Sequence, residues 1–137
     1  MRCSLMIAAA ALGLAACAPA AAPPPSQLDG AWEVQQIAGA DLNAQARIHF
    51  TIAGDEISGS TGCNSFAGAV TQFENTVTIS NVAATERACL EEAGNVNEQR
   101  FLGVLPAVTR FARNGARLEL LSNSEELLLA RAGEGAE

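Results

Sequence analysis

The chain has little positive charge and no long apolar run, and these two shortages argue against two classes of protein. It carries 8 basic residues, all arginine, against 15 Asp and Glu residues, so its formal net charge is −7. A nucleic-acid binder needs a basic patch to offset phosphate charge, so this balance argues against that class. No apolar stretch reaches the roughly 20 residues that a membrane-spanning helix needs.

Residue types for catalysis and for metal binding are also scarce. The only histidine, His49, alternates with apolar residues 48, 50 and 52, which predicts a strand with His49 on its solvent face. The chain shows no phosphate-binding loop and no metal-ligand cluster. Glu91 and Glu92 are expected to form a solvated turn rather than an acid/base pair. We therefore expect no enzyme and no cofactor, although an active site assembled only by folding stays open.

The first residues predict export. Arg2 precedes a short apolar stretch that ends in small residues, which is the pattern of a secretory signal peptide over residues 1–16. The stretch closes with Leu14-Ala15-Ala16-Cys17, which resembles the bacterial lipoprotein box. Cys17 is therefore the expected lipidation site, and several acyl chains at one terminus give a stable membrane anchor. The alternative is ordinary cleavage at residues 18–20, which would leave a soluble periplasmic protein.

The rest of the chain divides into a tether, a head and a tail. Residues 17–27 hold the lipidated cysteine and an Ala- and Pro-rich stretch, which favours an extended tether. Residues 28–132 form the expected globular domain, and residues 133–137 a flexible tail. Ala18, not Asp, follows the cysteine. By resemblance to the enterobacterial sorting rule, this favours an outer-membrane anchor with the head facing the periplasm.

The head is predicted to be mainly β, on the border of α+β. A period of two and brief turns predict about eight short strands and a small antiparallel, barrel-like sheet. These strands cover residues 32–37, 48–52, 56–59, 70–73, 77–80, 111–113, 117–121 and 126–130. Asn114-Gly115 predicts a hairpin turn in which both residues have positive φ.

One segment of the head has the periodicity of a helix. Asn95 and Glu98 predict its start, with Asn95 as the N-cap and Glu98 reaching back to it. Pro106 is expected to kink or end the helix. The apolar face is formed by Phe101, Leu102, Leu105 and Val108. We expect this helix to cover the open side of the sheet.

Two cysteines remain in the head. Cys3 leaves with the signal peptide and Cys17 carries the lipid, so Cys63 and Cys89 are left. An exported protein folds in an oxidising compartment, which predicts a disulfide between them. Two buried free thiols are the alternative.

Residues 62–68, Gly-Cys-Asn-Ser-Phe-Ala-Gly, resemble the hallmark stretch of the META domain family, the HslJ-like bacterial heat-shock lipoproteins. Further family elements fall in order: Leu-x-Gly-x-Trp at residues 28–32, Thr-x-x-Ala-Cys at 85–89, the helix at 98–105 and Leu-x-Leu at 118–120. Two residues depart from the pattern. Val70 stands where the family usually has Tyr, and Arg87 where Met is common.

The resemblance implies a small antiparallel β fold with one packed helix, an envelope location and a link to stress or to tolerance of hydrophobic antibiotics. It implies no catalytic residues. We therefore expect a non-enzymatic envelope lipoprotein that supports outer-membrane integrity. The alternative is an inhibitor or binding module for an envelope hydrolase, such as a lysozyme or a protease, because an acidic surface attracts basic enzymes. The expected partners are the membrane and an unidentified envelope protein, with no nucleic acid and no metal.

The motif residues are expected to act structurally. Trp32 and Phe66 are expected in the core, and Asn64 is expected to bond loop backbone. Positive φ or a close backbone approach around a bulge is expected at Gly59, Gly62 and Gly68.

Overall fold

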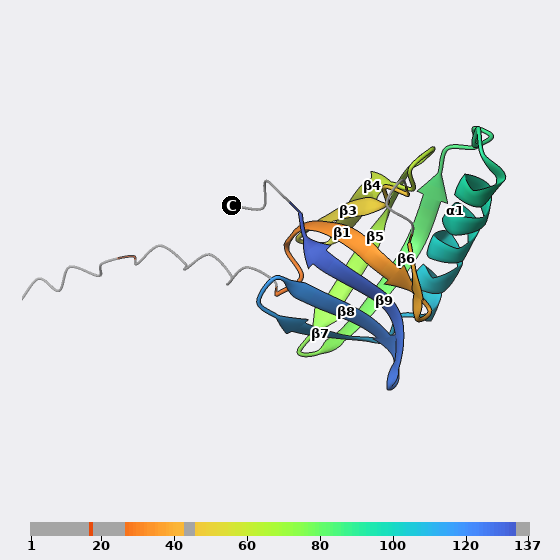
Figure 1. Ribbon diagram of the computed structural model, residues 1–137. Coiled ribbons are helices and arrows are strands. Elements are labelled where there is room, and N and C mark those ends of the chain that lie inside the picture. Colours follow the sequence, from red (N-terminus) through yellow and green to blue (C-terminus); the bar gives the residue numbers. More distant parts are fainter. Residues whose placement is uncertain (1–16, 18–26, 43–45, 134–137) are drawn as a thin grey trace, which may run out of the picture.

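A closed antiparallel sheet and one helix make up the part of the chain that this computed structural model describes, residues 17, 27–42 and 46–133 (Figure 1). The expected signal peptide, most of the tether and residues 134–137 of the expected tail lie outside those residues. The strands are β1 (Gly30–Ile37), β2 (Ala40–Asp41), β3 (His49–Ala53), β4 (Glu56–Ser60), β5 (Ser65–Phe73), β6 (Thr76–Ala84), β7 (Arg110–Asn114), β8 (Arg117–Ser122) and β9 (Glu125–Ala132).

The strands pair in the order of the sequence and then close on themselves. β3 to β9 follow β1 as successive antiparallel neighbours, and β9 returns to pair with β1. β2 adds two residues to the edge of β1 and is the one strand that the sequence did not predict. The mainly β, barrel-like fold class is confirmed, with nine strands where about eight were expected.

Alternation along each strand places one set of side chains inside the ring. In β3, Phe50 and Ile52 are buried, whereas His49 is exposed, as predicted. Because successive strand residues face opposite sides of a sheet, most strands contribute alternate residues to the interior. β9 departs from this pattern, because the adjacent residues Leu127 and Leu128 are both buried. The interior is filled by apolar side chains from every strand except β2, and the largest of them are Trp32, Phe50, Ile37, Ile52, Ile57, Leu118, Leu120 and Leu128.

The turn between β7 and β8 differs from the expected one by one residue. Asn114 is still paired, with Arg117, and the turn consists of Gly115 and Ala116. Gly115 has φ 60°, whereas Asn114 is not among the residues with positive φ. The prediction of positive φ at both Asn114 and Gly115 is therefore wrong. Extending the β7–β8 pairing by one residue satisfies backbone groups that a turn would have left open.

The helix α1 (Glu92–Val104) begins earlier than the sequence indicated. Its N-cap is Glu91, so Asn95 lies within the first turns and is not the cap. Glu98 does not reach back to a cap either. Its carboxylate instead accepts hydrogen bonds from Thr61 and Asn64, outside the helix. The predicted end is confirmed, because α1 stops at Val104 and a 3-10 turn (Leu105–Ala107) contains Pro106.

α1 packs on the interior of the ring through Phe101. This side chain is fully buried, and its ring centroid lies 5.2 Å from that of Phe66 and 6.4 Å from that of Phe50. The Arg100 guanidinium donates to the Ile37 carbonyl over 2.8 Å and so ties α1 to the end of β1. Figure 1 shows α1 beside β6, away from β7 and β8. Within the described residues, no helix is long and apolar enough to cross a membrane.

Candidate functional site

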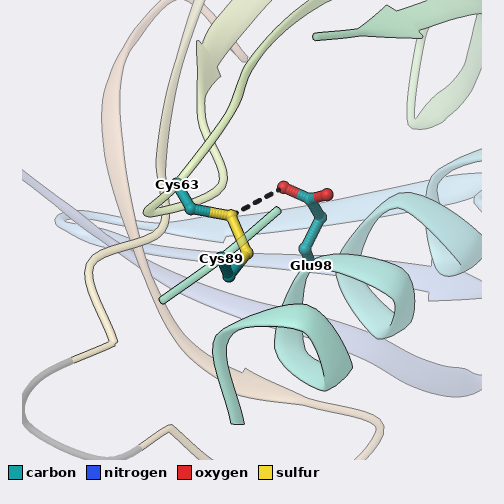
Figure 2. A group of neighbouring side chains, drawn as sticks. All are labelled: Cys63, Cys89 and Glu98. Atoms are coloured by element: carbon teal, nitrogen blue, oxygen red, sulfur yellow. Dashed lines mark hydrogen bonds between the residues drawn. A yellow bond between two sulfur atoms is a disulfide. The ribbon is translucent and has the colours of Figure 1, made fainter. Parts of the chain in front are cut away.

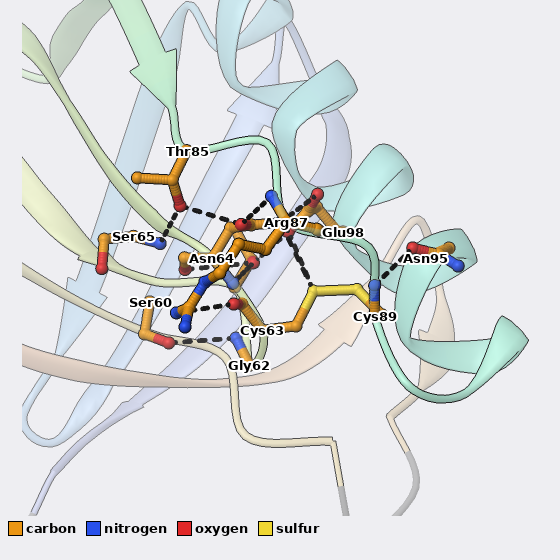
Figure 3. Close-up of a disulfide and its surroundings, with 11 residues drawn as sticks. Ser60, Gly62, Cys63, Asn64, Ser65, Thr85, Arg87, Cys89, Asn95 and Glu98 are labelled. Carbon is orange, nitrogen blue, oxygen red and sulfur yellow. Dashed lines mark hydrogen bonds between the residues drawn. A yellow bond between two sulfur atoms is a disulfide. The ribbon is translucent and has the colours of Figure 1, made fainter.

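Asn64 lies at the centre of a polar cluster between β4, β5 and α1 (Figure 3). Its side chain is 1% exposed. The amide oxygen accepts from the Arg87 backbone N–H and from the Thr85 hydroxyl, each over 2.8 Å. The amide nitrogen donates to the Arg87 carbonyl over 2.9 Å and to the Glu98 carboxylate over 2.8 Å. A planar carboxamide with two donors and one acceptor oxygen suits all four bonds at once.

Glu98 connects this cluster to the helix. Its carboxylate accepts from the Thr61 hydroxyl as well as from Asn64. The Thr61 hydroxyl oxygen in turn accepts from the Asn64 backbone N–H over 3.0 Å. Thr61 and Asn64 are the two buried polar residues of the described chain. Because burial is costly for a polar group without partners, these mutual bonds are what allow both residues to lie inside.

A disulfide joins Cys63 to Cys89, as the sequence predicted. The two Cα atoms are 5.5 Å apart, and the bond ties the loop after β4 to the loop that precedes α1. Gly94, on α1, lies against it: a Cβ built on Gly94 would be 3.1 Å from the Cys89 Cβ. The helix therefore packs closely on the disulfide at a point where any larger residue would press on it.

The segment between β6 and α1 is held by these same groups. Residues 85–89 have no regular secondary structure, and residues 85–88 are exposed. The Cys89 N–H donates to the Asn95 side-chain oxygen over 3.1 Å, and the Arg87 guanidinium donates to the Cys63 carbonyl over 3.2 Å. An exposed loop that is bonded at several points has little freedom left, which distinguishes it from an ordinary surface loop.

The motif glycines occupy positions where space or backbone conformation disfavours any other residue. A Cβ on Gly59 would lie 2.1 Å from the His49 carbonyl oxygen, so β3 and β4 approach closely only because Gly59 has none. Gly62 has φ +98°. Gly68 lies at the register shift between Ala67 and Ala69, where it faces a bulge of two residues in β6, Asn81 and Val82. The expectations of close approach, positive φ and a bulge are confirmed.

Trp32 and Phe66 are core residues, as expected. Trp32 is 1% exposed and Phe66 is 4% exposed. The Trp32 indole N–H donates to the Leu28 carbonyl over 2.9 Å, which satisfies its one polar group. The Arg113 guanidinium lies 4.9 Å from the centre of the Trp32 ring, a cation–π contact. Both rings are thus almost completely covered by other atoms of the protein.

The sequence pattern points to Asn64 and the cysteines but not to most of their partners. Asn64 bonds loop backbone, as expected, yet it also binds the side chains of Thr85 and Glu98, which the pattern does not predict. For Glu98 the local pattern predicts a role in the helix cap. No local signal could have placed it beside Asn64, because 34 residues separate the two along the chain. Val70 is buried, and Arg87 is exposed with a bond to Cys63.

One group of potential metal ligands occurs in the described residues. It consists of Cys63, Cys89 and Glu98, whose ligand atoms lie within 4.8 Å of one another (Figure 2). The two sulfur atoms are bonded to each other, which removes the thiolates that a soft metal would require. Glu98 Oε2 lies 3.4 Å from the Cys63 sulfur. The group is therefore a disulfide site rather than a metal centre.

A cleft of about 200 Å³ opens beside the disulfide. Arg47, Leu90 and Asn97 line it together with the two cysteines. Its volume lies below the range of about 300–1,000 Å³ that holds small-molecule ligands.

Cys17 is exposed and is the one free cysteine of the described residues.

The fold and the cluster define a small closed β-ring whose helix and exposed loop are tied together by one disulfide and one buried Asn. The META domain model matches residues 26–134, and the chain belongs to the META domain family. No curated protein matches the chain.

Two solved structures share the fold. An NMR structure of a protein from Burkholderia xenovorans has a TM-score of 0.64 and 20% identity, and the match covers 85% of this chain and 95% of that one. A second protein solved by NMR has a TM-score of 0.61 and 17% identity, with 77% and 90% covered. At these identities the similarity shows the fold alone.

Proposed function

We propose that this protein is a non-enzymatic lipoprotein of the cell envelope that supports outer-membrane integrity under stress and in the presence of hydrophobic antibiotics. The observation that carries the proposal is Cys17, which stands directly after Leu14-Ala15-Ala16 at the end of an apolar export segment. Lipid on this cysteine would hold the head at a membrane surface. The disulfide agrees with an oxidising compartment.

The organisation of the head supports a role without catalysis. The polar groups of the Asn64 cluster bond one another or the loop backbone and so serve the fold. The only histidine, His49, is exposed on β3 and has no acidic or nucleophilic partner among the hydrogen bonds of the described residues. The interior is packed with apolar side chains. Such a head offers a surface rather than a reaction centre.

Deletion and complementation test the proposal. A strain without the protein is expected to become sensitive to detergents and to large hydrophobic antibiotics, and the wild-type chain is expected to restore resistance. Cys17→Ser should not restore it, because the chain would lose its anchor. Cys3→Ser is the matched control and should restore it, because Cys3 leaves with the expected signal peptide. Wild-type resistance of the deletion strain under heat and drug would contradict the proposal.

A further inference from the structure

The backbone of residues 85–89 is bonded to the scaffold at every second residue (Figure 3). The Thr85 N–H donates to the Ser65 carbonyl over 2.9 Å. Both backbone groups of Arg87 bond the Asn64 carboxamide. The Cys89 N–H donates to Asn95 Oδ1 over 3.1 Å. In an extended chain, the backbone N–H and C=O groups of successive residues point to opposite sides. The pattern therefore indicates an extended segment in which the odd-numbered residues direct their backbone groups toward the protein.

The intervening residues face the other way. Glu86 and Ala88 are exposed, and within the described chain their backbone groups have no hydrogen-bond partner. Two residues further on, the Leu90 side chain is fully exposed. The loop therefore presents to solvent a short segment that is tied to the scaffold along one edge and unpaired along the other. Unpaired edges of this kind are templates for pairing with another protein chain.

Peptide substrates enter serine endoproteases as extended strands. The enzyme forms hydrogen bonds to the backbone of two substrate residues: the residue just before the scissile bond and the residue two positions before that one. The side chain of the residue just before the scissile bond enters the S1 pocket. Ala88 and Glu86 have this spacing, and both are exposed with backbone groups that bond nothing else in the described chain. Arg87 lies between them, and its backbone groups bond Asn64. This agrees with the substrate pattern, because the enzyme does not pair with the backbone of the middle residue.

We propose that residues 85–90 form a substrate-like loop that binds the active-site cleft of a serine endoprotease whose S1 pocket accepts a small side chain, with Ala88 in that pocket. The size of the pocket follows from Ala88, because a deep S1 pocket would stay largely empty around a methyl group. The proposal goes beyond membrane anchoring and does not depend on it.

The restraints on the loop favour inhibition over cleavage. Asn64 holds the chain before the Ala88–Cys89 peptide bond, whereas the disulfide and Asn95 hold the chain after it. A loop that is already ordered loses little conformational entropy on binding. The two ends of a cleaved bond would also stay in place, which opposes their release.

Inhibition assays with the full chain, purified in detergent, test the proposal. Pancreatic elastase, which has a small S1 pocket, is expected to be inhibited at micromolar or lower concentration, and trypsin is not. Ala88→Arg should weaken the inhibition of elastase by about tenfold or more and confer inhibition of trypsin, because the side chain in S1 sets the preference. Ala112→Arg, at another exposed alanine, is the matched control and should behave as the wild type.

A second variant tests the restraints rather than the pocket. Asn95→Ala removes the bond to the Cys89 N–H and leaves Ala88 in place. It should weaken the inhibition of elastase by about tenfold and speed cleavage after Ala88. Three results would overturn the proposal: no inhibition of elastase by the folded wild type, its rapid cleavage after Ala88, or inhibition that Ala88→Arg leaves unchanged. None of these would bear on acylation of Cys17, so the two proposals fail separately.

Discussion

The carboxamide of Asn64 holds both backbone groups of Arg87. The Arg87 N–H donates to Asn64 Oδ1 over 2.8 Å, and Asn64 Nδ2 donates to the Arg87 carbonyl over 2.9 Å. Two residues of an antiparallel ladder exchange the same pair of bonds. A buried side chain thus takes the place of a neighbouring strand at Arg87.

Removal of the Asn64 side chain should destabilise the head strongly. Asn64→Ala leaves both backbone groups of Arg87 without partners and takes one of two donors from the Glu98 carboxylate, which keeps Thr61. The free energy of unfolding should fall by about 3 kcal/mol. Asn64→Asp has the same shape but places a second carboxylate beside Glu98, so a similar loss is expected. Urea unfolding measures both variants. Asn75→Ala, in the exposed turn after β5, is the control, and a stable Asn64→Asp protein would contradict this account.

The disulfide should stabilise the fold mainly by restricting the unfolded chain. Cys63 and Cys89 are 26 residues apart in the sequence, and replacing both by serine opens the loop that they close. If the disulfide acts by reducing the entropy of the unfolded chain, the loss should be about 3.5 kcal/mol in the free energy of unfolding. Urea unfolding of the double variant checks the value. Alkylation of the denatured protein, followed by intact mass, checks the bond itself. Reduction should expose two additional thiols, and two reactive thiols in this pair before reduction would exclude the disulfide.

Gly59 should tolerate no side chain. A Cβ there would lie 2.1 Å from the His49 carbonyl oxygen and 2.7 Å from the Phe50 Cα, both backbone atoms of β3. Gly59→Ala should therefore cost about 3 kcal/mol or more, because one of the two strands must move. Gly103→Ala is the matched control: it is exposed on α1, with nothing within 4 Å of the added carbon. It should raise stability by about 0.5–1 kcal/mol. Thermal unfolding separates the two, and equal effects would refute the close approach.

Glu98 should attach α1 to the rest of the head. Glu98→Ala removes the acceptor for Thr61 and Asn64, which should lower stability by about 2 kcal/mol and speed amide hydrogen exchange in the first half of the helix. Gln99→Ala changes the next residue, which is exposed, and should change neither quantity. Similar exchange rates in both variants would show that the helix is held without Glu98, by contacts such as those of Phe101 and Arg100.

Structural features that produce a local periodicity of apolar residues could be predicted from the sequence. The presence of the eight longer strands, the apolar face of the helix around Phe101 and the exposed His49 each follow from spacing along a few residues. The full lengths of β5 and β6 do not, because these strands cover residues 65–73 and 76–84 where the spacing predicts only 70–73 and 77–80. The two-residue strand β2 has no periodicity to detect. The turn at Gly115 was displaced because Asn-Gly chemistry gave way to one more ladder pair at Asn114.

The polar cluster could be predicted only in part. Asn64 and Cys63 stand in a recognisable stretch, and Cys89 follows from counting cysteines. Asn95 and Glu98 match a local capping pattern, yet both side chains bond groups outside the helix. Such bonds depend on which segments the closed ring brings together, and local sequence patterns do not contain this information.

The mass of the N-terminal peptide, taken from protein isolated from cell envelopes, tests the central claim most directly. The claim is that the chain is a lipoprotein anchored through Cys17. The expected result is a peptide that begins at Cys17 and carries the mass of several acyl chains, absent in Cys17→Ser. A mature chain that begins after Cys17, or a Cys17 that carries no lipid, would contradict the account.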